Sequence, residues 1–191
     1  MDNRKKGIII LIIVAILIVV VFVLGFLFIQ NILSKFSEFP SIMGTKSIET
    51  DIEAPNFTLK NLNGEDVELS QIKGNIVLID FWAVWCKPCV GKLPSVQSIH
   101  EKYGEESLVV LAINVSEKEE KIKSFIEENN YTFPVLIGNK TVSNDYGAHA
   151  IPFVVLIDKE GTIRYTELGY RQGSEQKLIN EIEKLLEETS K

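Results

Sequence analysis

The sequence predicts one membrane-spanning helix followed by an α/β domain built on a central sheet. Two observations predict this organisation. Residues 8–29 form an unbroken apolar run without a charged residue, and about 20 helical residues cross the hydrocarbon core of a bilayer. After residue 53, runs typical of strands alternate with amphipathic runs typical of helices, which is the pattern of an α/β domain.

The apolar run is best explained as a retained anchor. A cleavable signal peptide has an apolar core of only about 7–15 residues that ends at small residues, whereas this run is longer and continues into residues 30–33. A buried helix of a globular core is the other alternative, and the length of the run disfavours it. Arg4, Lys5 and Lys6 precede the run, and the flank rich in Lys and Arg stays cytoplasmic.

The remaining chain is therefore expected outside the cytoplasm. The predicted order is a cytoplasmic tail (1–7), a transmembrane anchor (8–29), an extracytoplasmic linker (30–52) and the domain (53–191). The linker shows no sustained periodicity, and a coil of its length would hold the domain roughly 25 Å from the membrane. The chain has a net charge of −6, and part of its basic charge lies in the tail. An acidic exterior domain offers no basic surface for nucleic acid or for anionic lipid.

Within the domain, each element has its own signal. Asn63-Gly64 between two alternating runs is a strong hairpin signal. The run 75–82 is continuously β-branched and aromatic, as in a strand covered on both faces. Ile122, Phe125 and Ile126 form one stripe of an amphipathic helix. The expected elements, in chain order, are a hairpin (57–69), a strand (75–82), a helix (86–103), a strand (108–114), a helix (117–130), strands (133–138, 153–158 and 161–168) and a helix (174–188).

The two cysteines, Cys86 and Cys89, are the residues most informative about function. A structural zinc site needs four ligands, and the chain has only two histidines, His100 and His149. His100 falls near the end of the predicted cysteine helix, while His149 lies in a polar loop shortly before Pro152. Metal binding through one plausible histidine stays a minor alternative. A purely structural disulfide would close too short a loop to stabilise the fold much.

A helix that begins at Cys86 gives the pair a chemical role. Its unpaired backbone N–H groups and the positive end of its dipole favour the thiolate, which is the attacking form of cysteine. Pro88 would lie in the first turn, where its missing N–H is not needed. Lys87 adds a positive charge that should lower the pKa of Cys86 further, unless it is simply a solvated lysine. Cys89 would lie one turn further in, shielded and able to resolve a mixed disulfide.

The motif "FWAVWCKPC", preceded by "APNFTLKNLNGEDVELSQIKGNIVLID" and followed by "YGAHAIPFVVLIDKEGTIRY", resembles the membrane-anchored TlpA/ResA-like thiol-disulfide oxidoreductases of the thioredoxin and redoxin superfamily. The resemblance covers residues 53–188. It implies a thioredoxin-like fold with a central mixed sheet, helices on both faces and an N-terminal β-hairpin extension. It also implies a redox-active disulfide and no other cofactor or metal.

The same resemblance assigns roles to individual residues. It implies Cys86 as the nucleophile and Cys89 as the resolving cysteine, with Trp85 beside them. It implies that Pro152 is a cis proline opposite the pair and that Ile151, just before it, pairs its backbone with substrate. A cis X-Pro bond is uncommon enough to be a functional feature. An ordinary proline at the start of a strand is the alternative for Pro152.

Some positions depart from the ResA-like pattern. A glutamate usually stands three residues after the second cysteine in that branch, and here the position is Lys92, so its acid-base role is missing. Asp80 instead matches the buried aspartate of thioredoxin. Burial would raise the pKa of Asp80 and allow it to accept the proton of Cys89, unless it only hydrogen-bonds at a strand end. Pro94 also matches thioredoxin, where it kinks the helix, and Phe153 replaces the usual threonine after the cis proline.

The resemblance and the compartment suggest the direction of electron flow. A pair kept reduced in an oxidising exterior compartment needs electrons from across the membrane, and the family implies a polytopic membrane protein as thiol donor. We expect a reductase of exported disulfide proteins, with apocytochrome c as a substrate by analogy. An oxidase that introduces disulfides, a peroxidase and a noncatalytic copper-binding module using His149 are the alternatives.

Overall fold

The computed structural model describes residues 22–25, 46–104 and 108–188. The chain divides into two compact units, residues 1–42 and 43–191. In the first unit, only one exposed helical turn at residues 22–25 is described, so the rest of the predicted tail, anchor and early linker lies outside the described residues. No helix within the described ranges is both long and apolar enough to cross a membrane.

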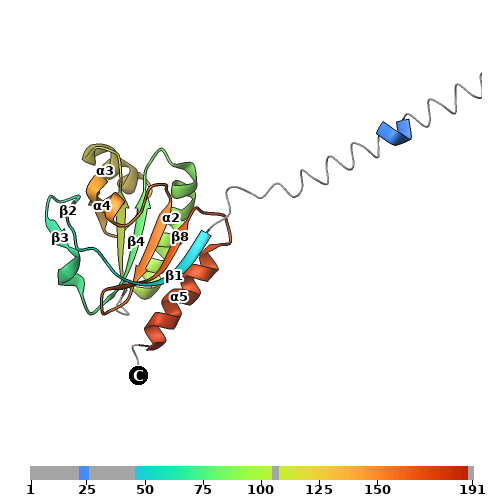
Figure 1. The fold of residues 1–191 in the computed structure, drawn as a ribbon. Coiled ribbons are helices and arrows are strands. Elements are labelled where there is room, and N and C mark those ends of the chain that lie inside the picture. The colour runs from blue at the N-terminus through green and yellow to red at the C-terminus, as the bar shows by residue number, and fades with distance from the viewer. Residues whose placement is uncertain (1–21, 26–45, 105–107, 189–191) are drawn as a thin grey trace, which may run out of the picture. The chain divides into compact units, whose positions relative to one another are not determined.

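The second unit is built on a mixed sheet. Its described strands follow the order β1-β8-β7-β4-β5-β6-β2-β3, with β4–β5 and β5–β6 parallel and the other pairs antiparallel. The strands are β1 (Lys46–Glu53), β2 (Thr58–Asn61), β3 (Asp66–Glu68), β4 (Ile76–Trp82), β5 (Leu108–Asn114), β6 (Val135–Ile137), β7 (Phe153–Ile157) and β8 (Thr162–Leu168). Figure 1 shows β1 and the β2–β3 hairpin at opposite ends of this sheet.

Five helical elements connect or follow the strands. They are η1 (Leu69–Ile72), α2 (Lys87–Tyr103), α3 (Glu119–Glu128), α4 (Lys140–Asp145) and α5 (Glu175–Glu188) among the described residues. Buried residues of α2, α3 and α5 form one apolar cluster with Leu78 of β4, whereas those of η1 and α4 form a second cluster with Ile79. Successive residues of a strand point to opposite faces, so these helices cover both faces of the sheet, as predicted.

Strand β4 lies at the centre of the sheet and is buried over its whole length. It pairs with β5 on one side and β7 on the other, which explains the continuous apolar run that the sequence shows there. Asp80 is the one charged residue within this strand. Every other expected strand and helix is also present, with ends shifted by a few residues at most.

Three elements were missed: β1, the short η1 and α4. Residues 46–52 were assigned to the linker, but they belong to β1, which pairs antiparallel with β8. The only apolar residues of β1, Ile48 and Ile52, are both exposed, so the run carries too little hydrophobic signal to stand out from a linker. Helix α4 was also missed because it has six residues and buries only Val142. Its start depends on Asn139, whose side chain accepts a hydrogen bond from the backbone N–H of Val142.

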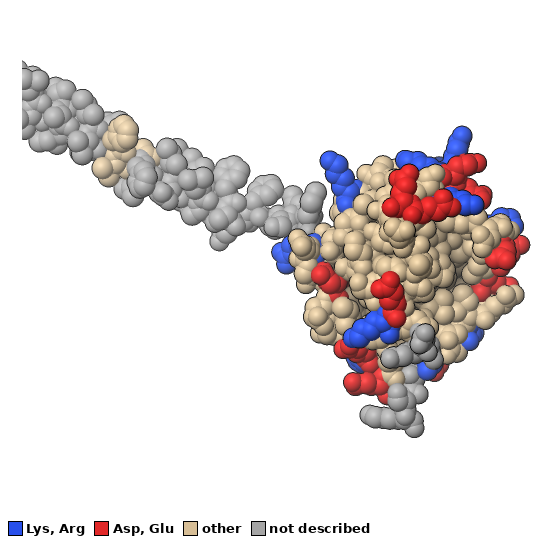
Figure 2. Space-filling model, turned by 180° about the vertical axis from the view of Figure 1, so that it is seen from behind, with Lys and Arg blue, Asp and Glu red and all other residues tan. Residues whose placement is uncertain are grey.

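The surface of the domain agrees with the acidic composition. Figure 2 shows acidic and basic side chains mixed over the face that it draws, with no extended basic patch. A nucleic-acid-binding surface normally gathers Lys and Arg on one face. The face drawn does not have that character.

Candidate active site

The two cysteines lie where β4 leads into α2. Cys86 is the N-cap of α2, and its Sγ accepts a hydrogen bond from the backbone N–H of Cys89 at 3.2 Å. Pro88 occupies the first turn of the helix, where the missing N–H leaves no intrahelical bond unmade. The predicted start of the helix at the first cysteine is therefore confirmed.

The cysteines form a disulfide in this structure. Both are buried, Cys86 slightly less than Cys89. The first turn of α2 contains no acidic residue, and Lys87 is exposed beside Cys86. Once the disulfide is reduced, a helix N-terminus with a neighbouring cation and no carboxylate favours a thiolate at Cys86.

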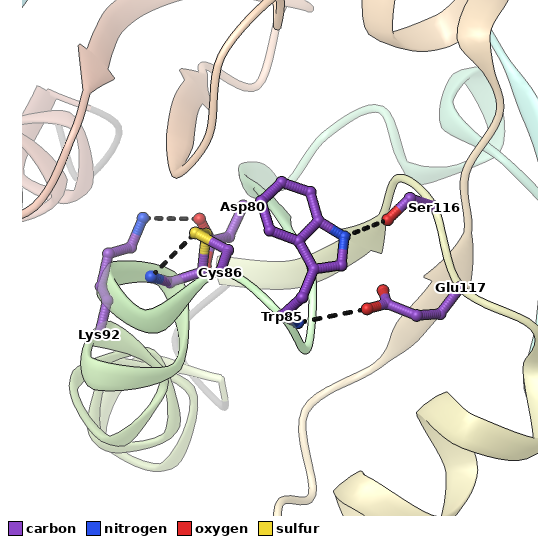
Figure 3. The surroundings of a disulfide bond; sticks show 7 residues. Asp80, Trp85, Cys86, Lys92, Ser116 and Glu117 are labelled. Carbon is purple, nitrogen blue, oxygen red and sulfur yellow. Dashed lines mark hydrogen bonds and ion pairs between the residues drawn. A yellow bond between two sulfur atoms is a disulfide. The ribbon is translucent and has the colours of Figure 1, made fainter.

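Trp85 is the exposed side chain next to the disulfide, with 63% of its surface accessible. Its Nε1–H donates to Ser116 Oγ at 2.8 Å, and its backbone N–H donates to Glu117 Oε1 at 3.3 Å (Figure 3). Lys121 also pairs with Glu117 Oε1, at 3.4 Å. The loop after β5 therefore holds the tryptophan in place.

Sequence analysis missed Ser116 and Glu117. A topological signal for them exists, because β4 and β5 are parallel and the residues that follow the carboxyl ends of parallel strands meet at the same edge of a sheet. The side chain of Asn114 fixes this loop by accepting hydrogen bonds from the backbone N–H groups of Ser116 and Glu117.

The peptide bond between Ile151 and Pro152 is cis, as expected. It precedes β7, whose first residue, Phe153, pairs with Phe81 near the end of β4. This pairing brings the cis peptide to the edge of the sheet that carries Cys86. Pro152 is buried, and Ile151 and Phe153 are half-buried.

Asp80 lies in β4 with none of its surface exposed. Its Oδ1 accepts a hydrogen bond from Lys92 Nζ at 2.6 Å, forming an ion pair in which the lysine side chain is only 7% exposed (Figure 3). Its Oδ2 has no hydrogen-bond partner among the described residues. Burial raises the pKa of Asp80, and Lys92 opposes this shift without cancelling it, so the predicted direction is confirmed.

The structure changes the meaning of Lys92. In the sequence, Lys92 marks only the position where the glutamate of the ResA-like pattern is lost, but in the structure it is the direct partner of Asp80. In the sequence, Lys92 lies among the buried positions Cys89, Leu93 and Val96 of α2. A lysine on the apolar face of a helix needs a buried counter-ion, and that was the available signal.

The histidines are not brought together with other metal-binding side chains. Within the described part of the chain, no group of three or more His, Cys, Asp and Glu residues is arranged to hold a metal ion. His149 is exposed in the loop before the cis peptide, and His100 is half-buried on α2.

The chain is similar to a known protein family and to several known proteins. Residues 51–166 match the AhpC/TSA family. The thioredoxin-like protein YneN of Bacillus subtilis is 37% identical over 136 residues, which is 69% of this chain and 79% of that protein. The thiol-disulfide oxidoreductase ResA of Bacillus cereus is 36% identical over 112 residues, or 58% of this chain and 65% of that protein.

Solved structures show the same fold. A protein of Chlorobium tepidum assigned as the thiol:disulfide interchange protein DsbE superposes with a TM-score of 0.67 at 28% identity, covering 73% of this chain and 99% of that one. The thioredoxin domain of a thiol-disulfide oxidoreductase from Bacteroides vulgatus gives a TM-score of 0.64 at 27% identity, with the same coverage. The fold is therefore thioredoxin-like.

The Asp80–Lys92 pair leads to a prediction about stability. Lys92→Met leaves a buried carboxylate without its counter-ion, and we expect the free energy of unfolding at neutral pH to fall by about 3–5 kcal/mol. The double variant Asp80→Asn/Lys92→Met contains no buried charge at this site and should recover most of that loss. Urea denaturation followed by circular dichroism measures both effects.

The pH dependence provides the control. The pKa of Asp80 is higher in the folded chain than its ordinary value. Protonated Asp80 therefore contributes its full stability below the ordinary aspartate pKa. This contribution is lost as the pH rises through the pKa of Asp80 in the folded chain. The deficit of Lys92→Met should therefore shrink in acid. A deficit that is constant across pH, or absent at neutral pH, would contradict this account.

Proposed function

Since the chain belongs to the AhpC/TSA family and is a thiol-disulfide oxidoreductase, we propose that it reduces disulfide bonds of exported proteins through Cys86 and Cys89. The observation that carries the proposal is the position of Cys86 as the N-cap of α2, with Cys89 buried behind it. This arrangement separates an attacking sulfur from a resolving one. The dithiol itself carries the electrons, and the reaction requires no further cofactor.

In the first step, the thiolate of Cys86 attacks one sulfur of the substrate disulfide. A bond forms between Cys86 Sγ and that sulfur, the substrate S–S bond breaks, and the second substrate sulfur leaves as a thiolate that takes a proton from water. The N–H groups at the start of α2 and the charge of Lys87 stabilise the attacking thiolate.

In the second step, Cys89 resolves the mixed disulfide. Its proton passes to the carboxylate of Asp80, and its sulfur attacks Cys86 Sγ. The bond between Cys86 and the substrate breaks, so the substrate leaves with both sulfurs reduced and the chain holds the Cys86–Cys89 disulfide. A general base contributes most when its pKa lies near the working pH, and the raised pKa of Asp80 moves it in that direction.

Substrate would bind around the exposed side of the disulfide. Trp85 provides an exposed aromatic surface that the loop after β5 holds in place. The backbone of Ile151, before the cis Pro152, offers N–H and C=O groups to an extended substrate segment, in the manner of an added strand. Lys87 and Pro88, which follow Cys86 in the chain, are also exposed. The half-buried Phe153 makes the groove more apolar than a threonine would.

Two features act in opposite directions on the reduction potential. Lys87 stabilises the reduced thiolate and makes the disulfide more oxidising, with about 1.4 kcal/mol corresponding to 30 mV. A buried carboxylate near the pair, at Asp80, disfavours additional negative charge on the sulfurs. We propose that the net effect on the reduction potential favours a reductase. An oxidase of the same fold is the alternative.

The site of action follows from the N-terminal run. With residues 8–29 as a membrane anchor and residues 1–7 in the cytoplasm, the domain acts at the outer surface of the cell membrane. Reducing equivalents would then reach Cys86–Cys89 from a polytopic membrane protein that relays electrons by thiol exchange. The substrates would be exported proteins with disulfides, among them apocytochrome c.

The assignment of the two cysteines is tested by single substitutions. Cys86→Ser should abolish reduction of insulin disulfides, because the attacking sulfur is missing. Cys89→Ser should form a mixed disulfide with insulin that persists, because no sulfur is left to resolve it. Turnover and non-reducing gels measure both, and normal turnover in either variant would contradict the proposal.

The direction of electron flow is tested in living cells. Rapid acid quenching followed by alkylation of free thiols reports the redox state of the cysteine pair. A reductase is expected to be mostly reduced at steady state. A pair that is mostly oxidised would establish the oxidase instead.

The location is tested by protease accessibility. With an epitope tag at the C-terminus, protease added to intact protoplasts should remove the tag, because the domain is expected outside the membrane. A cytoplasmic marker protein should stay intact in the same sample. Protection of the tag until the membrane is permeabilised would place the domain inside and overturn this part of the proposal.

A further inference from the structure

Lys92 connects the buried Asp80 with a hollow at the surface of the domain. Its Nζ lies 2.6 Å from Asp80 Oδ1, and its side chain also lines a small hollow between α2, β8 and the start of α5. The other polar residues that line this hollow include Glu167, Tyr170 and Glu175. Lys92 is the only cation among its described lining residues.

Further titratable groups lie around Lys92. Glu167 of β8 is buried and accepts a hydrogen bond from the hydroxyl of Tyr165 at 2.7 Å. Tyr170 follows β8, and Glu175 begins α5. Lys92 therefore lies between the carboxylate of Asp80 and a hollow lined by the carboxylates of Glu167 and Glu175.

The helix places Lys92 and Cys89 on one face. Residues three apart in a helix are neighbours on its surface, and both side chains are buried against the sheet. Figure 3 draws Asp80 and Lys92 among the residues that surround the disulfide. Asp80 Oδ1 is occupied by Lys92 Nζ, whereas Oδ2 has no hydrogen-bond partner among the described residues. One oxygen is thus fixed, and the other stays free to accept a proton.

We propose that Lys92 is a positioning residue that keeps Asp80 ionised and oriented, so that Oδ2 accepts the proton of Cys89 when the mixed disulfide is resolved. This inference rests on the proposed function. An isolated carboxylate in the protein interior takes up a proton and can then no longer act as a base. The ion pair between Lys92 and Asp80 opposes that uptake.

The step is balanced without a further reactant. The proton of the Cys89 thiol moves to Asp80, the new Cys89–Cys86 bond replaces the bond between Cys86 and the substrate, and the electron pair leaves with the substrate sulfur. Asp80 later releases the proton to solvent. Lys92 exchanges no electrons and forms no covalent bond.

The test separates the two chemical steps. The purified, reduced full-length chain is mixed in a stopped-flow instrument with one equivalent of an aromatic disulfide that releases a yellow nitrothiophenolate. Attack by Cys86 releases the first equivalent of the coloured thiolate, and attack by Cys89 on the mixed disulfide releases the second. The pH dependence of the rate of the second release reports the ionisation of the group that accepts the proton of Cys89.

We expect Lys92→Met to leave the first release within about twofold of the unmodified chain and to slow the second by at least about tenfold at neutral pH. The second rate should recover as the pH rises, because Asp80 then ionises without help from a cation. The double variant Asp80→Asn/Lys92→Met should match Asp80→Asn alone, since Lys92 acts through Asp80. Lys92→Arg keeps the cation and should keep the original pH profile if the larger side chain is accommodated.

Lys102→Met is the matched control. Lys102 lies on the same helix and pairs with Glu183 at 3.3 Å, but this pair is exposed, and neither release should change. An unchanged second release in Lys92→Met would overturn the inference while leaving the proposed function intact. If Lys92→Met does not fold, the second release of Asp80→Asn/Lys92→Met is compared with that of Asp80→Asn. A clearly slower double variant would overturn the inference, and equal rates would support it. Absence of a second release in the unmodified chain would instead reject the proposed function.

Discussion

The buried pair of Asp80 and Lys92 is the constraint on which the rest of the site depends. Removing a charged group from water costs several kcal/mol per ion, and Asp80 lies fully buried in the central strand. The carboxylate is tolerated because α2 places a lysine 2.6 Å away. This pair, together with the buried Leu93 and Val96 of α2, holds the helix against the sheet. The positions of Cys86 and Cys89, at the start of that helix, follow from this placement.

The site itself is assembled from three chain segments that meet at one edge of the sheet. The end of β4 leads into the cysteine helix, the end of the parallel β5 supplies the loop that holds Trp85, and the antiparallel β7 begins there with the cis peptide. Backbone pairing in the sheet thus sets the relative positions of the nucleophile, the aromatic surface and the exposed backbone.

Sequence alone predicted the features that depend on local chemistry. The Asn63-Gly64 turn, the continuous strand around Asp80 and the helix beginning at Cys86 each carry a signal within a few residues. Apart from the short α4, the main features it missed depend on contacts distant in the chain. Strand β1 exists because β8 is available to pair with it, and the partner of Lys92 lies 12 residues away on another element. No local pattern reports such contacts.

The two ends of the sheet have a consequence for the behaviour of the chain in a crowded solution. An exposed strand edge is a template for a strand from another molecule. Among the described strands, β1 ends the sheet on one side with the exposed Asp51 and Glu53 and a bulge, and β3 ends it on the other with only Asp66–Glu68. An antiparallel copy of β3 would place Asp66 opposite Glu68, and like charges directly opposite disfavour pairing; at β1 the irregular register interrupts the edge. The domain therefore resists strand-by-strand aggregation even though Ile48 and Ile52 are exposed on β1.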